Sequence, residues 1–564
     1  MAVVLNLIFD LLVISPIIIY MFLVPRMVHM MQLEGYKFKD YTRWLGKNLK
    51  NAFWPGMFQL IVIGAYGVFV AIINYILYKT NINNLTDSLV FTEYICMVLL
   101  FVVINVKQII KDKKSRKNAK KKLVYTARAK RLMFWNFALI ILTYASYMPN
   151  GEAFQNAGIV GASLYYMLML FFFTVMVALI PINVAIGNFL AYPTETVVQD
   201  YYESKARKKI KSKKFRHLIR IGVTGSYGKT STKCILKTIL SEKYNVYATP
   251  ESYNTTMGNV KVINNELKPE HEVFISEMGA RYRRDISDIC EFVMPQIGII
   301  TSIGPQHLES FGSIEKIVKT KSELLRALPS DGVVVLPRDN DHCQRLYSEE
   351  TREKICYTIK NSNADVYAKD VILDENGCSF TAHTSIGKIK CVTKLLGEHN
   401  VMNILGCIAI AVRLGLTVEQ IEAGVSKIEP VPHRLQILDS GNGTIVIDDA
   451  FNSNPVGSKM ALDVLSKFKG RKIIVTPGMV ELGDNEDAEN KKFGKNMSKV
   501  VDIAILVGIK RSKPIQEGLR EGKFDNMNIY VVADLEQATK KLAELTKKGD
   551  VILFENDLPD NYNE

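Results

Sequence analysis

Long apolar segments in the first 200 residues are the feature that most restricts what this chain can fold into. An α-helix needs about 20 consecutive apolar residues to cross the hydrocarbon core of a bilayer. Five segments approach or exceed that length, at about 2–25, 53–78, 88–110, 132–148 and 158–180, and the fourth is the shortest. They predict a polytopic α-helical membrane domain over residues 1–200 with about five transmembrane helices.

Less regular features occur at both ends of this region. The first segment lacks a basic n-region and a small-residue cleavage site and carries Asp10, which argues against a signal peptide. The stretch PINVAIGNFLAYP (181–193) contains two prolines and a glycine, and we interpret it as an interfacial or re-entrant piece. Asp10 and Glu93 lie near predicted span ends, where a carboxylate is either exposed at the interface or functional.

Lysine and arginine are unevenly distributed between the connecting loops. The loops at 26–52 and 107–131 and the segment at 205–214 are strongly basic, whereas 79–87 holds one lysine and 149–157 holds none. Because basic loops stay in the cytoplasm, we predict a multi-pass protein of the plasma membrane, with its N-terminus outside and everything after residue 200 in the cytoplasm. The basic runs are interpreted as orientation signals, with contact to anionic membrane lipid or a lipid-linked pyrophosphate as the alternative.

The net charge of +14 has the same origin, because the basic excess lies within the first 216 residues and the remainder is slightly acidic. A nucleic-acid enzyme would carry basic patches on its globular part, so we expect no nucleic-acid partner. Eight cysteines occur without a CxxC pair. That pattern excludes a zinc ribbon and a disulfide scaffold and fits a reducing compartment.

The sequence LIRIGVTGSYGKTST at 218–232 is typical of a phosphate-binding loop. A short β-rich run leads into a glycine turn and then a helical stretch, which is the context that such a loop requires. The backbone N–H groups of Gly225 to Thr230 would cradle phosphates at a helix N-terminus, Lys229 would reach the β- and γ-phosphates, and Thr230 would bind Mg²⁺. The chain has the short form TGxxGKT, since Val223 stands where the longer pattern has glycine.

Two later segments supply further polar residues to the same neighbourhood. HEVFISEMGA (271–280) predicts a strand that ends at Glu277. A second strand, at 297–302, leads to a loop with His307 and then to a helix with Lys321. We expect Glu277 to hold the metal, and His307 to be functional, because it follows a buried strand within reach of the phosphate loop.

These segments, with several that follow, resemble the Mur ligase family of ATP-dependent amide ligases, and most closely its D-alanyl-D-alanine-adding branch. The resemblance covers about residues 216–555, and it implies a P-loop doubly wound central domain at 217–435 and a Rossmann-like α/β C-terminal domain at 436–564, with ATP between them and Mg²⁺ as cofactor. The motifs, in the family's order, are TGSYGKTST, SEMGA, IGPQHLESFGS, TKSELL, LLGEHNVMNILGCIAIA, VPHRLQ, DDAFNSNPVGSKMAL and PGMVELGDNEDAEN.

The resemblance implies a role for each matching residue. Lys229, His307 and Lys321 are expected to be catalytic, and Lys321 matches a lysine that several members carbamylate to hold a second Mg²⁺. The loop SYNTTMG (252–258) would lie beside the acyl substrate. The implied metal ligands are Thr230, Glu277, His307 and Lys321. The implied nucleotide contacts are Thr224, Gly225, Ser226, Tyr227, Gly228, Lys229, Thr230, Ser231, His399, Asn400, Arg434, Asp449 and Asn454.

The implied function is that of a membrane-embedded ATP-dependent acid–amino-acid ligase. It would convert a carboxylate of a cell-envelope precursor, of the peptidoglycan type, into an acyl phosphate and join it to an amino acid or short peptide. Apolar spans stand where the family has a domain that grips a soluble UDP-sugar peptide, so a lipid-linked precursor is one option. RYRRD (281–285) and FENDLPDNYNE (554–564) also differ from the family pattern, and the substrates stay open.

Two alternatives accompany this hypothesis. One is a ligase similar to poly-γ-glutamate synthase, which also pairs a membrane segment with this type of ATPase. The other is a transporter or scaffold with a regulatory nucleotide-binding domain. The complete set of Lys229, Glu277, His307 and Lys321 favours catalysis, and the lack of charge clusters within the spans argues against transport.

Overall fold

Helices form the first part of the chain and two α/β sheets form the rest, in a computed structural model that describes residues 2–80, 86–119, 121–146, 158–251, 253–360, 362–439, 443–451 and 453–558. Contacts between residues divide the chain into two compact units, Met1–Val198 and Gln199–Leu558.

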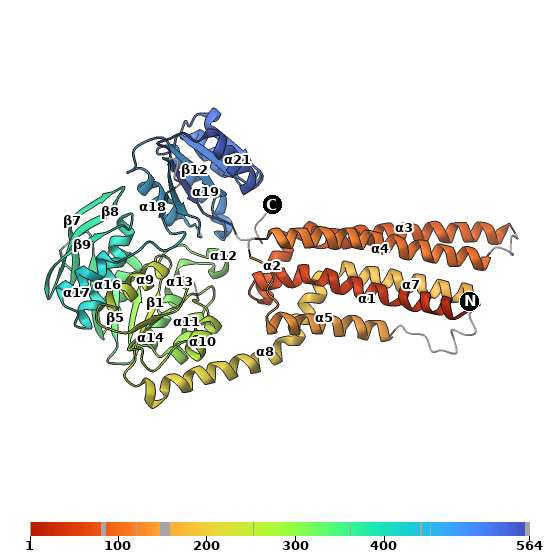
Figure 1. Cartoon of the computed structure of the whole chain (residues 1–564), viewed down its shortest axis with the longest axis horizontal. Helices are drawn as coiled ribbons and strands as arrows, with labels where there is room; N and C mark the ends of the chain where they lie inside the picture. Colours follow the sequence, from red (N-terminus) through yellow and green to blue (C-terminus); the bar gives the residue numbers. More distant parts are fainter. Residues whose placement is uncertain are drawn as a thin grey trace. The chain divides into compact units, whose positions relative to one another are not determined.

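The first unit is a bundle in which α1, α3, α4 and α7 run alongside one another (Figure 1). A helix satisfies its backbone hydrogen bonds internally, which suits segments this rich in apolar residues. The helices are α1 (Ala2–Leu33), α2 (Phe38–Lys47), α3 (Leu49–Lys79), α4 (Thr86–Asn118), α5 (Ala127–Ser146), α7 (Gly158–Ala178) and α8 (Ile180–Lys211), and α8 continues into the second unit.

Fewer helices than expected have the length and hydropathy of a membrane span. Among the described residues, three qualify, at Pro16–Leu33, Leu49–Leu77 and Thr92–Lys117, and the bent pair Met167–Ala178 with Ile180–Lys211 would make a fourth. Helix α5, which contains the predicted fourth segment, does not qualify, because Arg128, Lys130 and Arg131 occupy its first turns. The predicted loop at 149–157 and most of that at 79–87 lie outside the described residues, as does the side chain of Asp10.

The stretch 181–193, which we interpreted as an interfacial or re-entrant piece, is helical from end to end and belongs to α8. The chain bends by 72° between α7 and α8, at Leu179, and α8 then continues through Pro193. Pro181 lies in the first turn of α8, where the N–H that proline lacks has no partner within the helix. Both prolines and the glycine of this segment therefore lie within one continuous helix.

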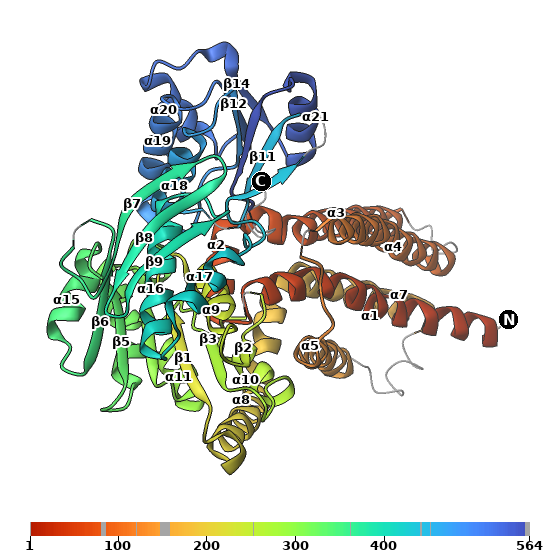
Figure 2. The same ribbon diagram turned by 60° about the vertical axis from the view of Figure 1, so that its left-hand side comes forward.

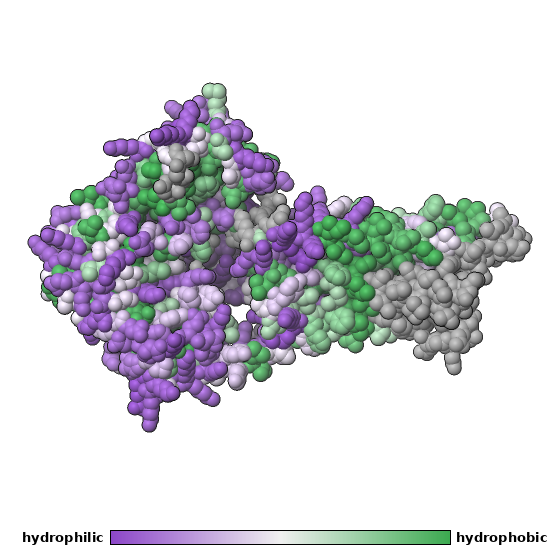
Figure 3. Space-filling view, viewed as in Figure 1, coloured by the Kyte–Doolittle hydropathy of each residue, from purple (hydrophilic) through white to green (hydrophobic). Residues whose placement is uncertain are grey.

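Apolar side chains cover the outside of this bundle. Ile61, Phe69, Leu99 and Val103 are each at least half exposed on α3 and α4. Figure 3 shows hydrophobic residues gathered over these two helices. A soluble protein rarely exposes a continuous apolar surface of this kind.

Two buried carboxylates of the bundle have polar partners. Glu93 is buried and accepts a hydrogen bond from Asn74 Nδ2 at 2.9 Å, so its carboxylate is not exposed at an interface. The Nε of Arg26 lies 3.9 Å from the carboxylate of Asp112. Pairing of this kind limits the large cost of placing a charge among apolar groups.

Helices α3 and α7 meet at Gly56, where an added Cβ would collide with the backbone of Ala178. We expect Gly56→Leu to lower the thermal unfolding midpoint of the detergent-solubilised protein, because the helices must separate at a cost of about 1–3 kcal/mol. Gly67→Leu on the same helix is the matched control, since nothing lies within 4 Å of a Cβ built there. Equal midpoints for the two variants would contradict this packing.

The second unit begins with a sheet of nine strands in the order β2-β3-β1-β4-β5-β6-β7-β8-β9. The strands from β2 to β7 pair in parallel, and β8 and β9 extend the sheet as antiparallel strands (Figure 2). The strands are β1 (Ile219–Thr224), β2 (Val246–Ala248), β3 (Val273–Glu277), β4 (Ile297–Ile300), β5 (Val333–Pro337), β6 (Glu353–Thr358), β7 (Val366–Asp374), β8 (Gly377–Thr384) and β9 (Gly387–Thr393).

Helices cover both faces of this sheet, as its doubly apolar strands require. Alternate strand residues such as Ile275 and Ile299 pack with α9, α16 and α17, and others such as Phe274 and Val334 pack on the opposite face. The elements are η2 (Lys213–Phe215), α9 (Lys229–Leu240), α10 (Thr256–Asn265), α11 (Asp285–Val293), α12 (Leu308–Phe311), α13 (Ile314–Lys321), α14 (Glu323–Ala327), α15 (Asp341–Glu349), α16 (Glu398–Arg413) and α17 (Val418–Ser426).

A second sheet of six strands follows, in the order β10-β11-β15-β12-β13-β14, with only β10 antiparallel. Helices α18, α19 and α20 pack on one face and α21 on the other, so the predicted α/β fold is confirmed for both sheets. The elements are β10 (Gln436–Asp439), β11 (Ile445–Asp449), α18 (Pro455–Leu465), β12 (Lys472–Thr476), η3 (Gly483–Asn485), α19 (Glu486–Met497), β13 (Ile503–Val507), α20 (Lys513–Glu521), η4 (Asn526–Asn528), β14 (Ile529–Val532), α21 (Leu535–Leu545) and β15 (Val551–Glu555).

Candidate active site

The phosphate loop follows β1, at the position where the strand order of the large sheet reverses. Ligands of open α/β sheets bind at this kind of switch point, outside the carboxyl ends of the strands. Gly228 has φ +78 and precedes α9, and a Cβ there would lie 2.7 Å from Asn403 Oδ1. Gly225 has φ +150 and packs against Thr301. Neither position tolerates a side chain, which explains both glycines of the short loop pattern.

Side chains of the loop tie it to the neighbouring strands. Thr224 Oγ1 donates to the carbonyl of Met278 at 2.7 Å, and Ser226 Oγ donates to the carbonyl of Gly304 at 3.0 Å. The N–H of Tyr227 donates to Ser302 Oγ at 3.3 Å, while Ser231 follows in the first turn of α9. These hydrogen bonds fix the loop against the segments that follow β3 and β4. The loop leads into the N-terminus of α9, and a helix N-terminus is suited to binding an anion.

Lys229 folds back onto the loop that it follows. Its Nζ donates to the carbonyls of Gly225 at 2.8 Å and Ser226 at 3.2 Å. Burial lowers the pKa of Lys229 to about 8, with Arg434 lowering it further and Glu277 opposing the shift. The ammonium is therefore poorly compensated, and an anion placed at the loop would stabilise its charged form.

Glu277 ends β3 directly beside the loop. Its Oε1 accepts hydrogen bonds from Thr230 Oγ1 and Asn254 Nδ2, both at 3.1 Å. Its Oε2 forms an ion pair at 3.0 Å with the ammonium of Lys233, which is equally buried. Sequence reasoning missed Lys233, although its position one helical turn after Lys229 places it on the same face of α9.

A hydroxyl and a carboxylate in contact are suitable ligands for Mg²⁺. Among the described residues, no group of three or more His, Cys, Asp and Glu side chains is close enough to hold a metal ion. Glu277 and His307 thus do not by themselves form a ready site. A metal ion at this site would also need the Thr230 hydroxyl and an anionic form of Lys321 as ligands. Only the four groups together fit a metal ion.

Lys321 is the last residue of α13 and is 3 % exposed. Burial holds its pKa well below the usual value, and the charge of Lys229 lowers it further, against Asp285, Glu323 and Glu277. The same interactions place Lys321 in one electrostatic neighbourhood with Lys229 and Glu277. This lowered pKa favours the neutral amine, which is the form that can act as a nucleophile.

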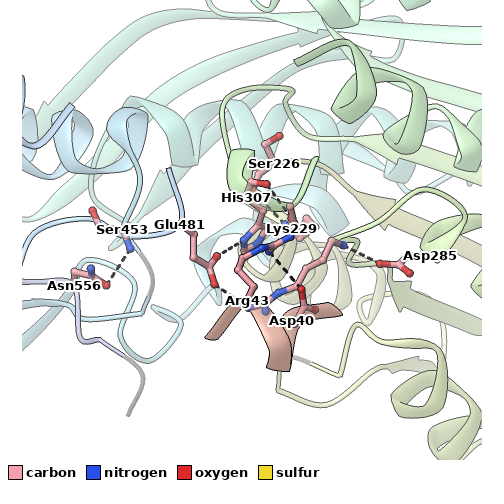
Figure 4. A network of polar contacts seen from close by, with 11 residues as sticks. Asp40, Arg43, Ser226, Lys229, Asp285, His307, Ser453, Glu481 and Asn556 are labelled. Carbon is pink, nitrogen blue, oxygen red and sulfur yellow. Dashed lines mark hydrogen bonds and ion pairs between the residues drawn. The ribbon is translucent and has the colours of Figure 1, made fainter. Parts of the chain in front are cut away.

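His307 lies in the loop between β4 and α12, and its Nδ1 contacts Glu481. Burial lowers the pKa of His307, an effect that Glu481 opposes and that Arg281 and Lys229 reinforce. Figure 4 shows His307, Ser226 and Lys229 gathered on one side of Glu481. Glu481 belongs to the motif PGMVELGD, but its partner is 174 residues away, so no local spacing pointed to it.

Two predicted nucleotide contacts, His399 and Asn400, lie in the first turn of α16. Burial lowers the pKa of His399 to about 4, so its imidazole is neutral at pH 7. Asn400 Nδ2 donates to the carbonyl of Leu396 at 2.9 Å. Asn403, which sequence reasoning missed, accepts from Thr232 Oγ1 at 3.2 Å and lies against Gly228, so it connects α16 to the phosphate loop.

The remaining predicted contacts come from the linker to the small sheet and from the small sheet itself. The Arg434 guanidinium stands 4.3 Å from the ring centroid of Phe451, and burial lowers its pKa. Asp449 ends β11, and burial raises its pKa to about 6 against the charge of Arg434. Asn454 caps α18, because its Oδ1 accepts from the N–H groups of Val456 and Gly457 at 3.1 and 2.8 Å.

A second buried carboxyl group lies beside Asp449 at the carboxyl edge of the small sheet. Glu555 ends β15 in register with Asp449 and accepts hydrogen bonds from Ser453 Oγ and from Thr476 Oγ1. Burial raises its pKa to about 7. The N–H of Ser453 donates to Asn556 Oδ1 at 3.2 Å, a contact visible in Figure 4.

Comparison with known proteins gives this site a family context. Residues 223–411 match the Mur ligase middle domain, and residues 433–555 match the domain described as "Mur ligase, glutamate ligase domain". The UDP-N-acetylmuramoyl-tripeptide–D-alanyl-D-alanine ligase of Mycobacterium tuberculosis is 34% identical over 355 residues, which cover 59% of this chain and 69% of that protein. The Bacillus subtilis ligase of the same name is 32% identical over 345 residues, covering 59% and 72%.

Solved structures show the same likeness. The MurF ligase of Thermotoga maritima in complex with ADP superposes with a TM-score of 0.56 at 27% identity, covering 64% of this chain and 80% of that one. MurF from Acinetobacter baumannii gives a TM-score of 0.58 at 25% identity, covering 65% and 78%. Both family matches lie within residues 223–555, so neither includes the helical unit.

Proposed function

Because the chain belongs to the Mur ligase family of ATP-dependent ligases, we propose that it activates a carboxylate of a peptidoglycan-type envelope precursor and joins it to an amino acid or short peptide. The observation that carries this proposal is the convergence of Lys229, Glu277 and Lys321 beside a phosphate loop. Named relatives act on a UDP-N-acetylmuramoyl tripeptide and D-alanyl-D-alanine, so this amine is the first candidate. The relatives are ligases, and they favour neither the transporter nor the poly-γ-glutamate alternative.

The chemistry begins with a carboxylate, which cannot acylate an amine until it has a leaving group. Transfer of the γ-phosphoryl group of ATP to the carboxylate oxygen gives an acyl phosphate and ADP. Attack of the amine nitrogen on the acyl carbon then forms the amide, releases phosphate and frees a proton. Lys229 and the loop N–H groups would hold the phosphates during both steps, and Arg434 adds positive charge nearby.

Bound Mg²⁺ would neutralise phosphate charge. Thr230, Glu277, His307 and a carbamylated Lys321 are the residues proposed to hold it. The contact between Thr230 and Glu277 supports this choice, and the buried Lys321 amine supports its modification. At the small sheet, Arg434 and Asp449 are proposed to contact the nucleotide together with His399 and Asn400.

The helical unit is proposed to span the plasma membrane, with the N-terminus outside and the ligase in the cytoplasm. Three apolar helices of sufficient length and the exposed apolar side chains of α3 and α4 support this placement. We further propose that the precursor is lipid-linked. A lipid tail confines the precursor to the surface to which the ligase is attached, and so raises its effective concentration.

Two acceptors with the same peptide but different carriers test this part of the proposal. The full-length protein in lipid nanodiscs receives ATP, Mg²⁺, D-alanyl-D-alanine and either a lipid-linked or a UDP-linked muramoyl tripeptide, and mass spectrometry measures the amide product. We expect at least about a tenfold preference in kcat/KM for the lipid-linked acceptor. Equal kcat/KM values for the two acceptors would contradict a role of the helical unit in substrate choice and leave it only the role of a membrane anchor.

A further inference from the structure

Glu481 connects the two α/β sheets of the second unit at the proposed metal site. It lies between β12 and η3, in the part of the chain that forms the small sheet, and its carboxylate contacts His307 Nδ1 in the large-sheet part. Its second oxygen accepts a hydrogen bond from Arg281 Nη2 at 3.1 Å. Its backbone carbonyl accepts one from the N–H of Glu309 at 3.3 Å. The side chain and the backbone are therefore both held.

Both members of the His307–Glu481 pair have unusual backbone conformations. His307 has φ +53 and Glu481 has φ +66, in the left-handed region that residues with a side chain rarely adopt. Such conformations persist only where surrounding contacts enforce them, which is common at functional sites. The two strained residues face each other across the junction of the two sheets (Figure 4).

The chemistry of the contact determines which ring nitrogen carries the proton. An ionised carboxylate only accepts hydrogen bonds, so Nδ1 of His307 must be the donor. In a neutral imidazole with its proton on Nδ1, the lone pair is on Nε2. This nitrogen can then bind a metal ion. Carboxylates that accept the second N–H of a metal-binding histidine fix its tautomer and its orientation.

We propose that Glu481 is a positioning residue that holds His307 with the Nε2 lone pair available to the metal. The inference rests on the proposed function, since it takes His307 as a metal ligand. Arg281 fixes the rotation of the carboxylate by binding its other oxygen. Because Glu481 belongs to the small-sheet part and His307 to the large-sheet part, the histidine is correctly set only while the two parts are in contact.

The test uses the full-length protein with Mn²⁺ in place of Mg²⁺ and a non-hydrolysable ATP analogue. Electron paramagnetic resonance measures the dissociation constant of Mn²⁺ and detects the ¹⁴N coupling of a directly bound imidazole. We expect wild-type protein to show this coupling and His307→Ala to lose it. Glu481→Ala should weaken Mn²⁺ binding about 10–100-fold and diminish the coupling.

Two further variants separate positioning from general damage. Glu481→Gln keeps an acceptor oxygen and should restore much of the Mn²⁺ affinity and coupling that Glu481→Ala loses. Asp484→Ala, three residues further on and exposed, is the matched control and should bind Mn²⁺ as wild type does. Thermal unfolding midpoints identify any variant that fails to fold.

The outcomes distinguish this inference from the proposed function on which it rests. If wild-type protein shows no imidazole coupling that His307→Ala removes, the metal role of His307 fails. If wild type shows the coupling and folded Glu481→Ala retains both the coupling and the affinity within about twofold, Glu481 is not a positioning residue.

Discussion

Lys229→Ala is expected to reduce ATP-dependent phosphate release by about 10³-fold, the largest effect of any single substitution in the site. Lys229 folds against the carbonyls of Gly225 and Ser226, in an environment that lowers its pKa to about 8. A polyphosphate placed at the loop would turn this costly buried charge into a stabilised one, most strongly as negative charge shifts between the β- and γ-phosphates.

Lys237→Ala provides the matched control for this prediction. Lys237 lies on the same helix, two turns beyond Lys229, and its side chain is exposed. We expect this variant to retain phosphate release within about twofold, as surface substitutions usually do. Wild-type phosphate release in Lys229→Ala, or an equal loss of phosphate release in both variants, would contradict the assignment of this segment as a phosphate loop.

Lys321→Ala is expected to reduce turnover at least about 100-fold, because it removes a proposed metal ligand. Burial and the charge of Lys229 hold the pKa of Lys321 well below its usual value, which favours the neutral amine. A neutral amine attacks CO₂ to give a carbamate and a proton, and the carbamate supplies the anionic oxygens that Mg²⁺ prefers. Activity should therefore fall when dissolved CO₂ is removed and recover when bicarbonate is added.

The variants of Lys321 distinguish a carbamate from a simple charge. Lys321→Arg keeps the positive charge but cannot be carbamylated, so it should be as inactive as Lys321→Ala. Formate or acetate should partly restore the alanine variant by supplying carboxylate oxygens. Lys319→Ala, exposed on the same helix, is the control. Full activity of Lys321→Arg would show that no carbamate is needed.

Local sequence was sufficient to predict the phosphate loop and the strands beside it. The run that ends at Thr224, the two glycines with positive φ and the helix from Lys229 are neighbours in the chain, so a short pattern contains the whole structure. Glu277 could be placed for a related reason, because a strand that ends in a carboxylate has its end at the ligand-binding edge of the sheet.

Residues that meet only through the tertiary fold could not be predicted in this way. Asn403 reaches the phosphate loop from α16, and Glu481 reaches His307 from beyond β12. Glu555 carries a buried carboxyl group beside Asp449 only because β15 inserts between β11 and β12. None of these pairings leaves a fixed spacing in the sequence.

The helical unit shows a different limit of sequence reasoning. Hydropathy located α1, α3, α4 and α7, but it extended the count to α5, whose first turns carry basic residues. The two prolines and the glycine of 181–193 suggested an interfacial or re-entrant piece. The segment is a continuous part of α8, and the chain bends by 72° just before it, at Leu179. Pro181 lies in the first turn of α8, where the N–H that proline lacks has no partner within the helix, and α8 continues through Pro193.

The central claim is tested most directly by the two-substrate dependence of ATP cleavage. Purified full-length protein in nanodiscs receives ATP and Mg²⁺ with the muramoyl tripeptide acceptor, the amine, both or neither, while phosphate release and product mass are followed. We predict rapid phosphate release only with both substrates present, with one phosphate released for each amide formed. Sustained phosphate release that is independent of the two substrates, with no condensed product from any envelope precursor tried, would contradict the assignment of this chain as an envelope-precursor ligase.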